Sequence, residues 1–358
     1  MDEVNSIEKK WNPNIQALRG LSITLVMISH FLGYPKQFGA FGVGIFFCIS
    51  GYLITGILIS EFRETGRISI PTFYQRRAKR LLPLCYVVII FVMTIVLVGS
   101  LFPNFMTQIS RTDNHGDLRH YFLSAIFSLF YVGNFFGLAG LGYTDLAGGL
   151  AHFWTLAVEE QFYFMWPILL LVILKKWSRH LSAICVVGIF VTPMLHFIFS
   201  LYDKTSWTLP TSYLDLFFFG ALFTIHREKI RKFGRSKSLI LAGVVVSSCL
   251  IANGIQQEDF SSQGYLLFTI AEILIFIGFL NWKPFGQVKV LRKLGNLSYS
   301  LYCIHWPIII LFSNIEINTL IKKLITILLT FILAIISTKY IETIFWKPRY
   351  LESKNKSQ

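Results

Sequence analysis

The chain alternates between long apolar runs and short polar connections. Ten of the runs are long enough to cross a bilayer as helices, since one crossing needs about 20 mostly apolar residues. These runs lie at about residues 14–33, 38–60, 82–102, 152–174, 181–201, 209–226, 238–255, 264–281, 295–313 and 320–342. The pattern predicts an all-α, polytopic membrane protein with about ten transmembrane helices.

An eleventh apolar run, 121–141, is rich in glycine and aromatic residues. Lysine and arginine are concentrated in the cytoplasmic loops of membrane proteins, so the basic stretches 61–80 and 175–180 are expected on the cytoplasmic side. An even number of crossings must separate them, which predicts that 121–141 is re-entrant or interfacial. Both termini are then cytoplasmic. The alternative places Lys175 and Lys176 outside and gives eleven spans.

Composition supports the membrane class and narrows the partners. Hydrophobic residues make up 54% of the 358 residues, and the net charge is +14. The basic residues fall in short clusters between apolar runs, a pattern of topology, so no nucleic acid is expected. The five cysteines lack metal-ligand spacing, so no metal is expected. We predict a cytoplasmic N-terminus at 1–13, one membrane domain at 14–346 and a cytoplasmic tail at 347–358.

The first span carries two ionisable residues, Arg19 and His30. Such groups are costly at membrane depth and indicate a functional site by default. Eleven positions at about 100° each return to within roughly 20° of the same helix face, about 16 Å further along the axis. With the N-terminus inside, Arg19 lies near the cytoplasmic end. His30 lies deeper, where a neutral imidazole could act as general base on a hydroxyl.

Further polar residues lie inside the other spans and together imply a polar cavity. For each residue taken singly, a structural role in an ion pair or in a hydrogen bond between helices has the same weight as a role in such a cavity. The candidates for a pore or substrate site are Ser50, His152, Asp215, Ser298, Tyr302 and His305. The last three are spaced at i, i+4 and i+7, which predicts one hydrogen-bonding helix face.

Two pairs of charged residues suggest further roles. Arg77 and Arg80 are three positions apart, so on a helix they would share a face and could bind phosphate oxygens together. Taken alone, these arginines fit better as a topological anchor or a contact with anionic membrane lipid. Glu159 and Glu160 are adjacent and cannot both face inward. We expect one to orient a partner and the other to meet an interface.

Several motifs occur in the order of a known family. They are Ala17-Leu18-Arg19-Gly20 with His30; Phe46-Phe47-x-x-Ser50-Gly51; Arg77-x-x-Arg80 with Pro83; Trp154-x-Leu156-x-Val158-Glu159; Leu297-Ser298-Tyr299-x-Leu301-Tyr302-x-x-His305-x-Pro307; and Tyr340-Ile341-Glu342. Asp215 with Gly220 matches a weaker feature. From about Asn14 to Arg349 the chain resembles the acyltransferase-3 family, integral-membrane enzymes that acylate bacterial surface sugars such as O-antigen and peptidoglycan.

The resemblance implies a ten-helix enzyme of the bacterial cytoplasmic (inner) membrane. It would take an acyl group, usually acetyl, from cytoplasmic acyl-CoA and deliver it to a glycan hydroxyl, on a free or lipid-linked acceptor. The family's essential histidine and arginine correspond to His30 and Arg19. Arg77 and Arg80 correspond to a motif that meets the phosphates of acetyl-CoA or another acyl-CoA, and Glu159 to a polar pore position. We expect Glu159 or a neighbour to orient His30.

Departures from the family pattern are few. Thr155 stands where serine is common, and a proline usual after the last motif is delayed to Pro348. The tail ends soon after Arg349, so we expect the form that lacks a C-terminal esterase-like domain. Two alternatives stay open: an acyltransferase for a small molecule or lipid, and a transporter or flippase, since intramembrane charges also mark substrate pathways. The inverted repeats frequent in transporters were not found in the sequence.

Overall fold

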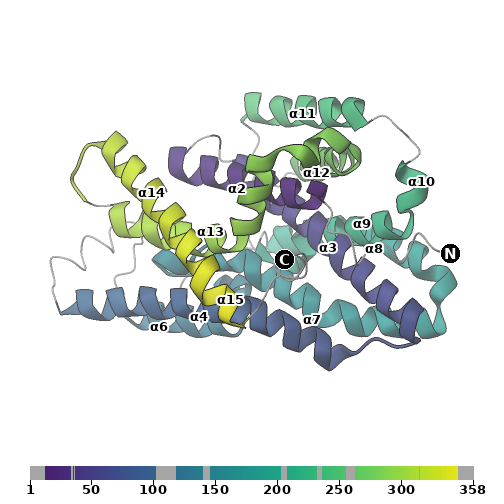
Figure 1. The fold of residues 1–358 in the computed structure, drawn as a ribbon, viewed down its shortest axis with the longest axis horizontal. Helices are drawn as coiled ribbons and strands as arrows, with labels where there is room; N and C mark the ends of the chain where they lie inside the picture. Colours follow the sequence, from purple (N-terminus) through teal and green to yellow (C-terminus); the bar gives the residue numbers. More distant parts are fainter. Residues whose placement is uncertain are drawn as a thin grey trace, which may run out of the picture. The chain divides into compact units, whose positions relative to one another are not determined.

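The computed structural model describes residues 13–33, 35, 37–101, 118–139, 146–202, 208–231, 236–254, 263–313 and 315–345 (Figure 1). Within these ranges the chain forms helices and turns and no strand. The long helices are α2 (Pro13–Leu32), α3 (Gln37–Thr65), α4 (Ile70–Ser100), α7 (Phe153–Lys176), α8 (Leu181–Tyr202), α12 (Gln263–Asn281), α13 (Lys289–Ser313) and α14 (Thr319–Ser337). Shorter helices are α6 (Leu118–Leu129), α9 (Leu214–Ile225), α10 (Arg227–Arg231), α11 (Ser236–Ala252) and α15 (Thr343–Phe345).

The predicted class, an all-α polytopic membrane protein, is confirmed. Eight helices in the described ranges are long and apolar enough to cross a membrane. The two other predicted spans correspond to the shorter apolar helices α9, with 12 residues, and α11, with 17. Large apolar side chains are exposed on α4, α8 and α14, including Ile90, Phe190 and Leu328. Exposed apolar surface of this kind is typical of helices that face lipid.

The structure differs in form from the predicted boundaries at two places. The basic stretch 61–80 is largely helical, because α3 continues to Thr65 and α4 begins at Ile70. Within 121–141, α6 is followed by the short 3₁₀ turns η2 (Gly133–Phe135) and η3 (Gly137–Ala139). The described part of that run is therefore broken well before the length of a crossing, in keeping with its predicted exclusion from the spans.

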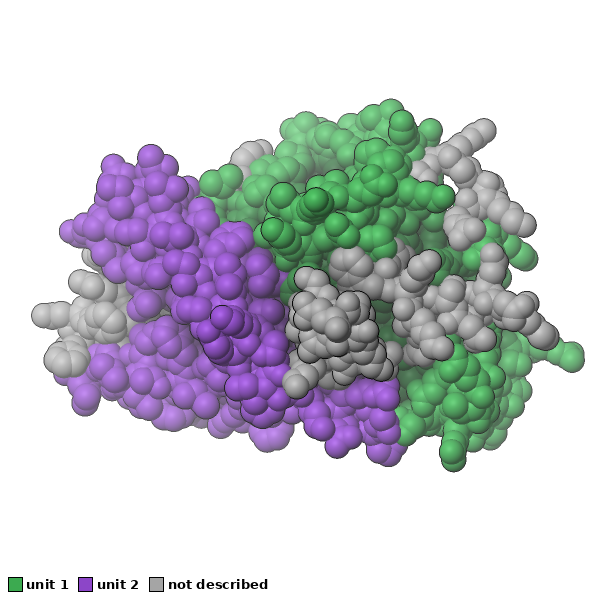
Figure 2. Space-filling view, in the orientation of Figure 1, with its two compact units in different colours: residues 1–70, 161–296 green, residues 71–160, 297–358 purple. Residues whose placement is uncertain are grey.

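The chain divides into two compact units (Figure 2). Unit 1 contains Met1–Ile70 and Gln161–Asn296, and unit 2 contains Pro71–Glu160 and Leu297–Gln358. Helices α7 and α13 contribute to both units. The predicted division into two tails and one membrane domain stays a prediction, since most of both tails lies outside the described residues.

Unit 1 is built around α3, which packs against α2, α9 and α12. At its crossing with α9, each helix presents a glycine to the backbone of the other. A Cβ atom on Gly51 would overlap the carbonyl of Phe217, and one on Gly220 would overlap the carbonyl of Cys48. Small residues permit this close approach of membrane helices. Helices α11 and α12 lie side by side in the same unit (Figure 1).

A single side chain fixes the start of α2 in unit 1. Nδ2 of Asn14 donates to the carbonyl oxygens of Phe279 and Leu280, both at 3.0 Å, and of Trp282 at 3.1 Å. Carbonyl groups at a helix end have no partner within the helix, and inside a membrane each unsatisfied group is costly. Asn14 therefore satisfies the end of α12 and anchors the helix that carries Arg19 and His30.

Unit 2 is held together by hydrogen bonds made by α13. The hydroxyl of Tyr299 donates to the carbonyl of Leu81 on α4 at 2.5 Å. Ser300 lies 2.8 Å from the hydroxyl of Thr338 and also donates to Glu342. Both partners of Ser300 belong to η9 (Thr338–Glu342), a π-helical turn after α14. Such turns are rare and are often found at functional sites.

Candidate functional site

Helix α2 carries Arg19 and His30, as predicted, on one continuous helix. Both side chains are half-buried. His30 lies in the last turn, before Gly33, whose amide donates to the carbonyl of Ser29 at 2.9 Å and whose φ is +79°. A glycine in this left-handed conformation is a common helix end. His30 is thus two residues from the C-terminal end of the helix.

The beginning of α3 lies beside His30 in unit 1. A Cβ atom built on Gly39 would lie 3.8 Å from Nε2 of His30 and 3.1 Å from Oγ of Ser29. A side chain at position 39 would therefore approach the imidazole nitrogen. Gly39 was not singled out by the sequence, since a glycine in an apolar helix is ordinarily a packing residue.

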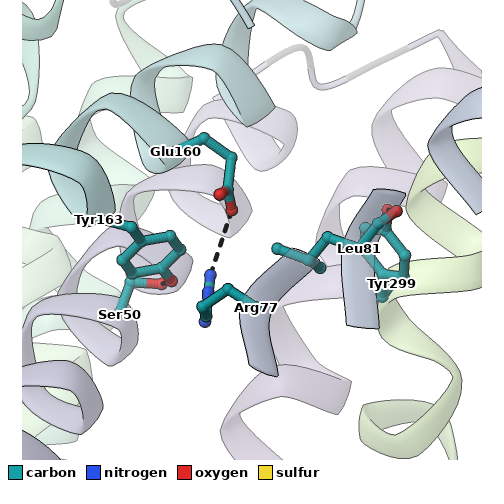
Figure 3. A network of polar contacts seen from close by, with 6 residues as sticks. All are labelled: Ser50, Arg77, Leu81, Glu160, Tyr163 and Tyr299. Atoms are coloured by element: carbon teal, nitrogen blue, oxygen red, sulfur yellow. Dashed lines mark hydrogen bonds and ion pairs between the residues drawn. The ribbon is translucent and has the colours of Figure 1, made fainter. Parts of the chain in front are cut away.

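Ser50 acquires a partner that the sequence could not identify. The hydroxyl of Tyr163 donates to Oγ of Ser50 at 2.6 Å, and both side chains are buried (Figure 3). Tyr163 comes from the part of α7 that belongs to unit 1. This bond brings a polar residue of α3 and one of α7 together inside the apolar interior of the unit.

Asp215 lies in the first turn of α9 and is buried. Its Oδ2 accepts a hydrogen bond from Thr269 of α12 at 3.2 Å, and Tyr265 lies beside it. Tyr265 in turn stacks on His196, with ring centroids 5.1 Å apart. His196 lies 2.7 Å from the hydroxyl of Ser212. The predicted pore residue Asp215 is thus one member of a polar network that connects α8, α9 and α12.

In unit 2, Arg77 forms an ion pair with Glu160 (Figure 3). Nη2 of Arg77 lies 3.2 Å from Oε1 of Glu160. Arg77 and Arg80 both belong to α4, so the predicted helical spacing is present. Their phosphate role stays a prediction. The pairing of Arg77 with Glu160 was not predicted.

A second cluster of unit 2 contains three of the predicted pore residues. The hydroxyl of Tyr302 donates to the carbonyl of His152 at 3.1 Å and contacts the hydroxyl of Thr155. The rings of His152 and His305 lie 5.2 Å apart, at 74° to each other. Nε2 of His152 lies 3.3 Å from the carbonyl of Cys303. All these side chains are buried, which makes the cluster a polar island within the membrane helices.

The face predicted on α13 is present. Ser298, Tyr302 and His305 are all buried on this helix. Nδ1 of His305 lies 2.7 Å from the carbonyl of Tyr302, within its own helix. This contact is the kind expected of a structural histidine. Of the two histidines in the cluster, His152 makes the longer-range contact, with the backbone of α13.

The predicted site residues fall into both units. Arg19, His30, Ser50 and Asp215 belong to unit 1, whereas Arg77, Arg80, His152, Glu159, Ser298, Tyr302 and His305 belong to unit 2. The proposed interaction of Glu159 with His30 and the catalytic roles stay predictions. The sequence missed Glu160, Tyr163 and Tyr299 as partners. In the sequence, each of these three is a polar residue inside an apolar run. Such a residue needs a polar partner, but the sequence does not identify that partner.

The sequence was also compared with known protein families, proteins and structures. A family model described as an acyltransferase domain, Acyl_transf_3, matches residues 12–345. The O-acetyltransferase OatA of Staphylococcus aureus (strain NCTC 8325 / PS 47) is 29% identical over 363 residues, which cover 93% of this chain and 57% of the relative. The peptidoglycan O-acetyltransferase OatA of Listeria monocytogenes is 30% identical over 369 residues, which cover 96% and 57%.

The chain thus spans less than two thirds of the length of these relatives. No solved structure matches it.

Proposed function

The chain belongs to the acyltransferase-3 family, and from this premise we propose that it is a membrane O-acetyltransferase acting on a bacterial surface glycan. The observation that carries the proposal is the similarity to O-acetyltransferases over more than nine tenths of this chain. The Listeria relative is named for peptidoglycan, so peptidoglycan is the first acceptor to test. O-antigen, capsule and exopolysaccharide are the other glycans that the family resemblance suggests.

In the proposed reaction, His30 is the general base. It takes the proton of the acceptor hydroxyl as the oxygen attacks the thioester carbonyl of acyl-CoA. The carbon–sulfur bond breaks, the ester forms, and the proton passes to the departing thiolate, so no net proton is released. The half-buried position of His30, two residues from the end of α2, supports this role because a hydroxyl at a membrane surface can approach a helix end.

Three arginines are the proposed contacts for the phosphates of acyl-CoA: Arg19, Arg77 and Arg80. Guanidinium groups bind phosphate oxygens through paired, charge-assisted hydrogen bonds. Arg77 is already paired with Glu160, so phosphate would have to compete with that carboxylate. The axial distance from Arg19 to His30, roughly 16 Å on a helix, is of the order that an extended pantetheine arm spans.

The proposed location is the bacterial cytoplasmic membrane, with both termini inside. Donor phosphates then meet the arginine-rich ends of the helices from the cytoplasm, where acyl-CoA is made. Excess positive charge near 61–80 and 226–237 supports this orientation. Contact of Ser182 with His226, at 2.9 Å, brings the start of α8 to the end of α9, which supports placing both on the same side of the membrane.

The function is tested with the full chain in proteoliposomes. Radiolabelled acetyl-CoA is supplied on one side and peptidoglycan fragments on the other, and mass spectrometry follows the acetyl mass on the glycan. We expect acetylation by the wild type and none by a folded His30→Ala variant. Acetylation of neither peptidoglycan nor any other surface glycan, by protein that is folded and correctly inserted, would overturn the proposal.

A further inference from the structure

Glu272 is a fully buried acid, and neither of its carboxylate oxygens is hydrogen-bonded in the described structure. Its side chain is 0% exposed, in the middle of α12. A buried polar group without a partner is costly, and an ionised one far more so. The family motifs and the proposed reaction give this residue no role.

The helix opposite Glu272 leaves room for its carboxyl group. A Cβ atom on Gly44 of α3 would overlap both oxygens and the carboxyl carbon of Glu272. The glutamate therefore occupies the space that a side chain at position 44 would fill. Its carboxyl group points at the backbone of α3 and away from lipid, as intramembrane acids are expected to do.

A second acid acts on Glu272 within the same unit. Asp215 of α9, 1% exposed, is hydrogen-bonded to Thr269, which lies three positions before Glu272 on α12, and its charge acts on Glu272. Asp215 has donors in Thr269, Tyr265 and the backbone of Leu216, whereas neither oxygen of Glu272 has one in the described structure. Thr269 and Glu272 lie on α12, with Tyr265 one turn before Thr269.

Among the described residues, no positively charged group acts on Glu272. Asp215 is the charged group that acts on it, while the Cys48 thiol of α3 and the Tyr265 hydroxyl of α12 lie within range of its charge. Helix α12 also packs against α2 and α11. The ionisable side chains of α2 and α11 are Arg19, His30, Lys237 and Cys249. None of these four is among the groups that act on Glu272 in the described structure.

Two neighbouring carboxylates cannot both stay ionised in such a place. Like charges repel strongly where the surroundings are apolar, and each ion also loses its hydration. A proton on one carboxyl group removes one charge and supplies the missing donor. A metal ion would need more ligands, and no group of three His, Cys, Asp or Glu side chains gathers anywhere in the described residues.

We propose that Asp215 and Glu272 form a proton-binding site within unit 1, in which the two carboxyl groups hold one proton between α9, α12 and α3. The site is separate from the transfer reaction, which releases no net proton. Its consequence is that the packing of α3 on α12 depends on the proton. Loss of the proton would leave both acids charged, with the Glu272 carboxylate against Gly44, and would favour separation of the two helices.

The test uses the full chain in lipid nanodiscs and infrared difference spectroscopy. A protonated carboxylic acid has a carbonyl stretch that a carboxylate lacks, so the wild type should show this band at neutral pH. Glu272→Gln and Asp215→Asn should each change the frequency or intensity of the band, because each removes one of the two carboxyl groups that share the proton; a band unaltered by Asp215→Asn would mean that Glu272 holds the proton alone. The matched control is Glu316→Gln, which changes an exposed acid outside the spans and should leave the band intact.

Stability gives a second readout. Unfolding releases the proton to water at neutral pH, so the thermal stability of the wild type should fall as pH rises. Glu272→Gln, a neutral mimic of the protonated acid, should remove most of that dependence. Absence of the protonated-acid band in the wild type at neutral pH, which would mean that both carboxyl groups are ionised, would overturn the proposal without any variant. So would displacement of the proton by sodium at fixed pH, because the pair would then be a sodium site.

Discussion

Arg77 and Glu160 form an ion pair, with Nη2 and Oε1 3.2 Å apart and each side chain about one fifth exposed or less. The pair joins the basic segment of α4 to the motif-bearing start of α7, both within unit 2. Under the proposed function, Arg77 has two competing partners, the carboxylate of Glu160 and the phosphates of the donor. If Arg77 binds the phosphates as proposed, acyl-CoA must displace Glu160 from this arginine or share it.

The exchange predicts opposite effects for the two partners. Arg77→Ala combined with Arg80→Ala should raise the KM for acyl-CoA several-fold with a smaller change in kcat. Glu160→Gln keeps the shape but removes the competing charge, so it should lower that KM. Breaking the ion pair should cost about 1–3 kcal/mol of stability, between surface and buried pairs. Donor titrations with the purified variants measure the two changes in KM, and thermal unfolding measures the loss of stability.

An unchanged donor KM in the double arginine variant would contradict the phosphate role. Arg77→Lys is the matched control, since it keeps the charge and loses the planar, two-pronged geometry. It should fall between the wild type and Arg77→Ala. A lysine variant indistinguishable from the wild type would mean that charge alone matters at this position.

His30 offers the most direct test of the chemistry. Removing a general base typically costs about 10²–10⁴-fold in rate, so His30→Ala and His30→Gln should lose nearly all acyl transfer. Binding of acyl-CoA should persist, because the proposed phosphate contacts are elsewhere. The measurement is single-turnover acetyl transfer alongside donor binding. A well-folded His30→Gln with normal turnover would end the assignment of His30 as base.

Gly39 provides a control for the surroundings of His30. A side chain at this position would lie near Nε2 of the imidazole without replacing it. Gly39→Ala should therefore reduce transfer less than His30→Gln does, with the helices intact. If neither Gly39→Ala nor the bulkier Gly39→Leu changed the rate of acyl transfer, the substrate would not approach His30 from the side that Gly39 borders.

The helices were readily predicted because their signal is local. Apolar length fixes a span, and charge between spans indicates its orientation, so α2, α3 and α12 were located within a few residues. The interactions across helices were not predictable in the same way. Spacing correctly placed Ser298, Tyr302 and His305 on one buried face, yet nothing in it paired Tyr163 with Ser50, because that bond depends on how two distant segments cross.

The hydrogen bond between Tyr163 and Ser50 should be energetically modest. Such bonds between membrane helices average about 0.6 kcal/mol and reach about 1.7 in double-mutant cycles. Tyr163→Phe and Ser50→Ala should each lower stability slightly, and the double variant should show a coupling of that size. Thermal unfolding in detergent provides the values. A coupling near zero would indicate that the bond contributes nothing to the packing of α3 on α7.

If Ser50 also meets substrate, the two variants should differ in activity. Tyr163→Phe leaves the serine hydroxyl in place and should retain most acyl transfer. Ser50→Ala removes it and should lower transfer beyond what its loss of stability explains. Equal activities at equal stability would assign both residues to structure alone, which is the alternative that the sequence left open for each polar residue.

The glycines of α3 allow a matched test of helix packing in one helix. A Cβ atom on Gly51 would overlap the carbonyl of Phe217, whereas one on Gly56 would lie 3.5 Å from Cγ2 of Thr224, an ordinary contact. Gly51→Ala should force α3 and α9 apart and sharply lower stability. Gly56→Ala should be neutral or slightly stabilising, because alanine favours a helix over glycine by about 0.8–1.0 kcal/mol. Thermal unfolding of both variants at one pH makes the comparison, and equal stability would mean that α3 and α9 do not cross at Gly51.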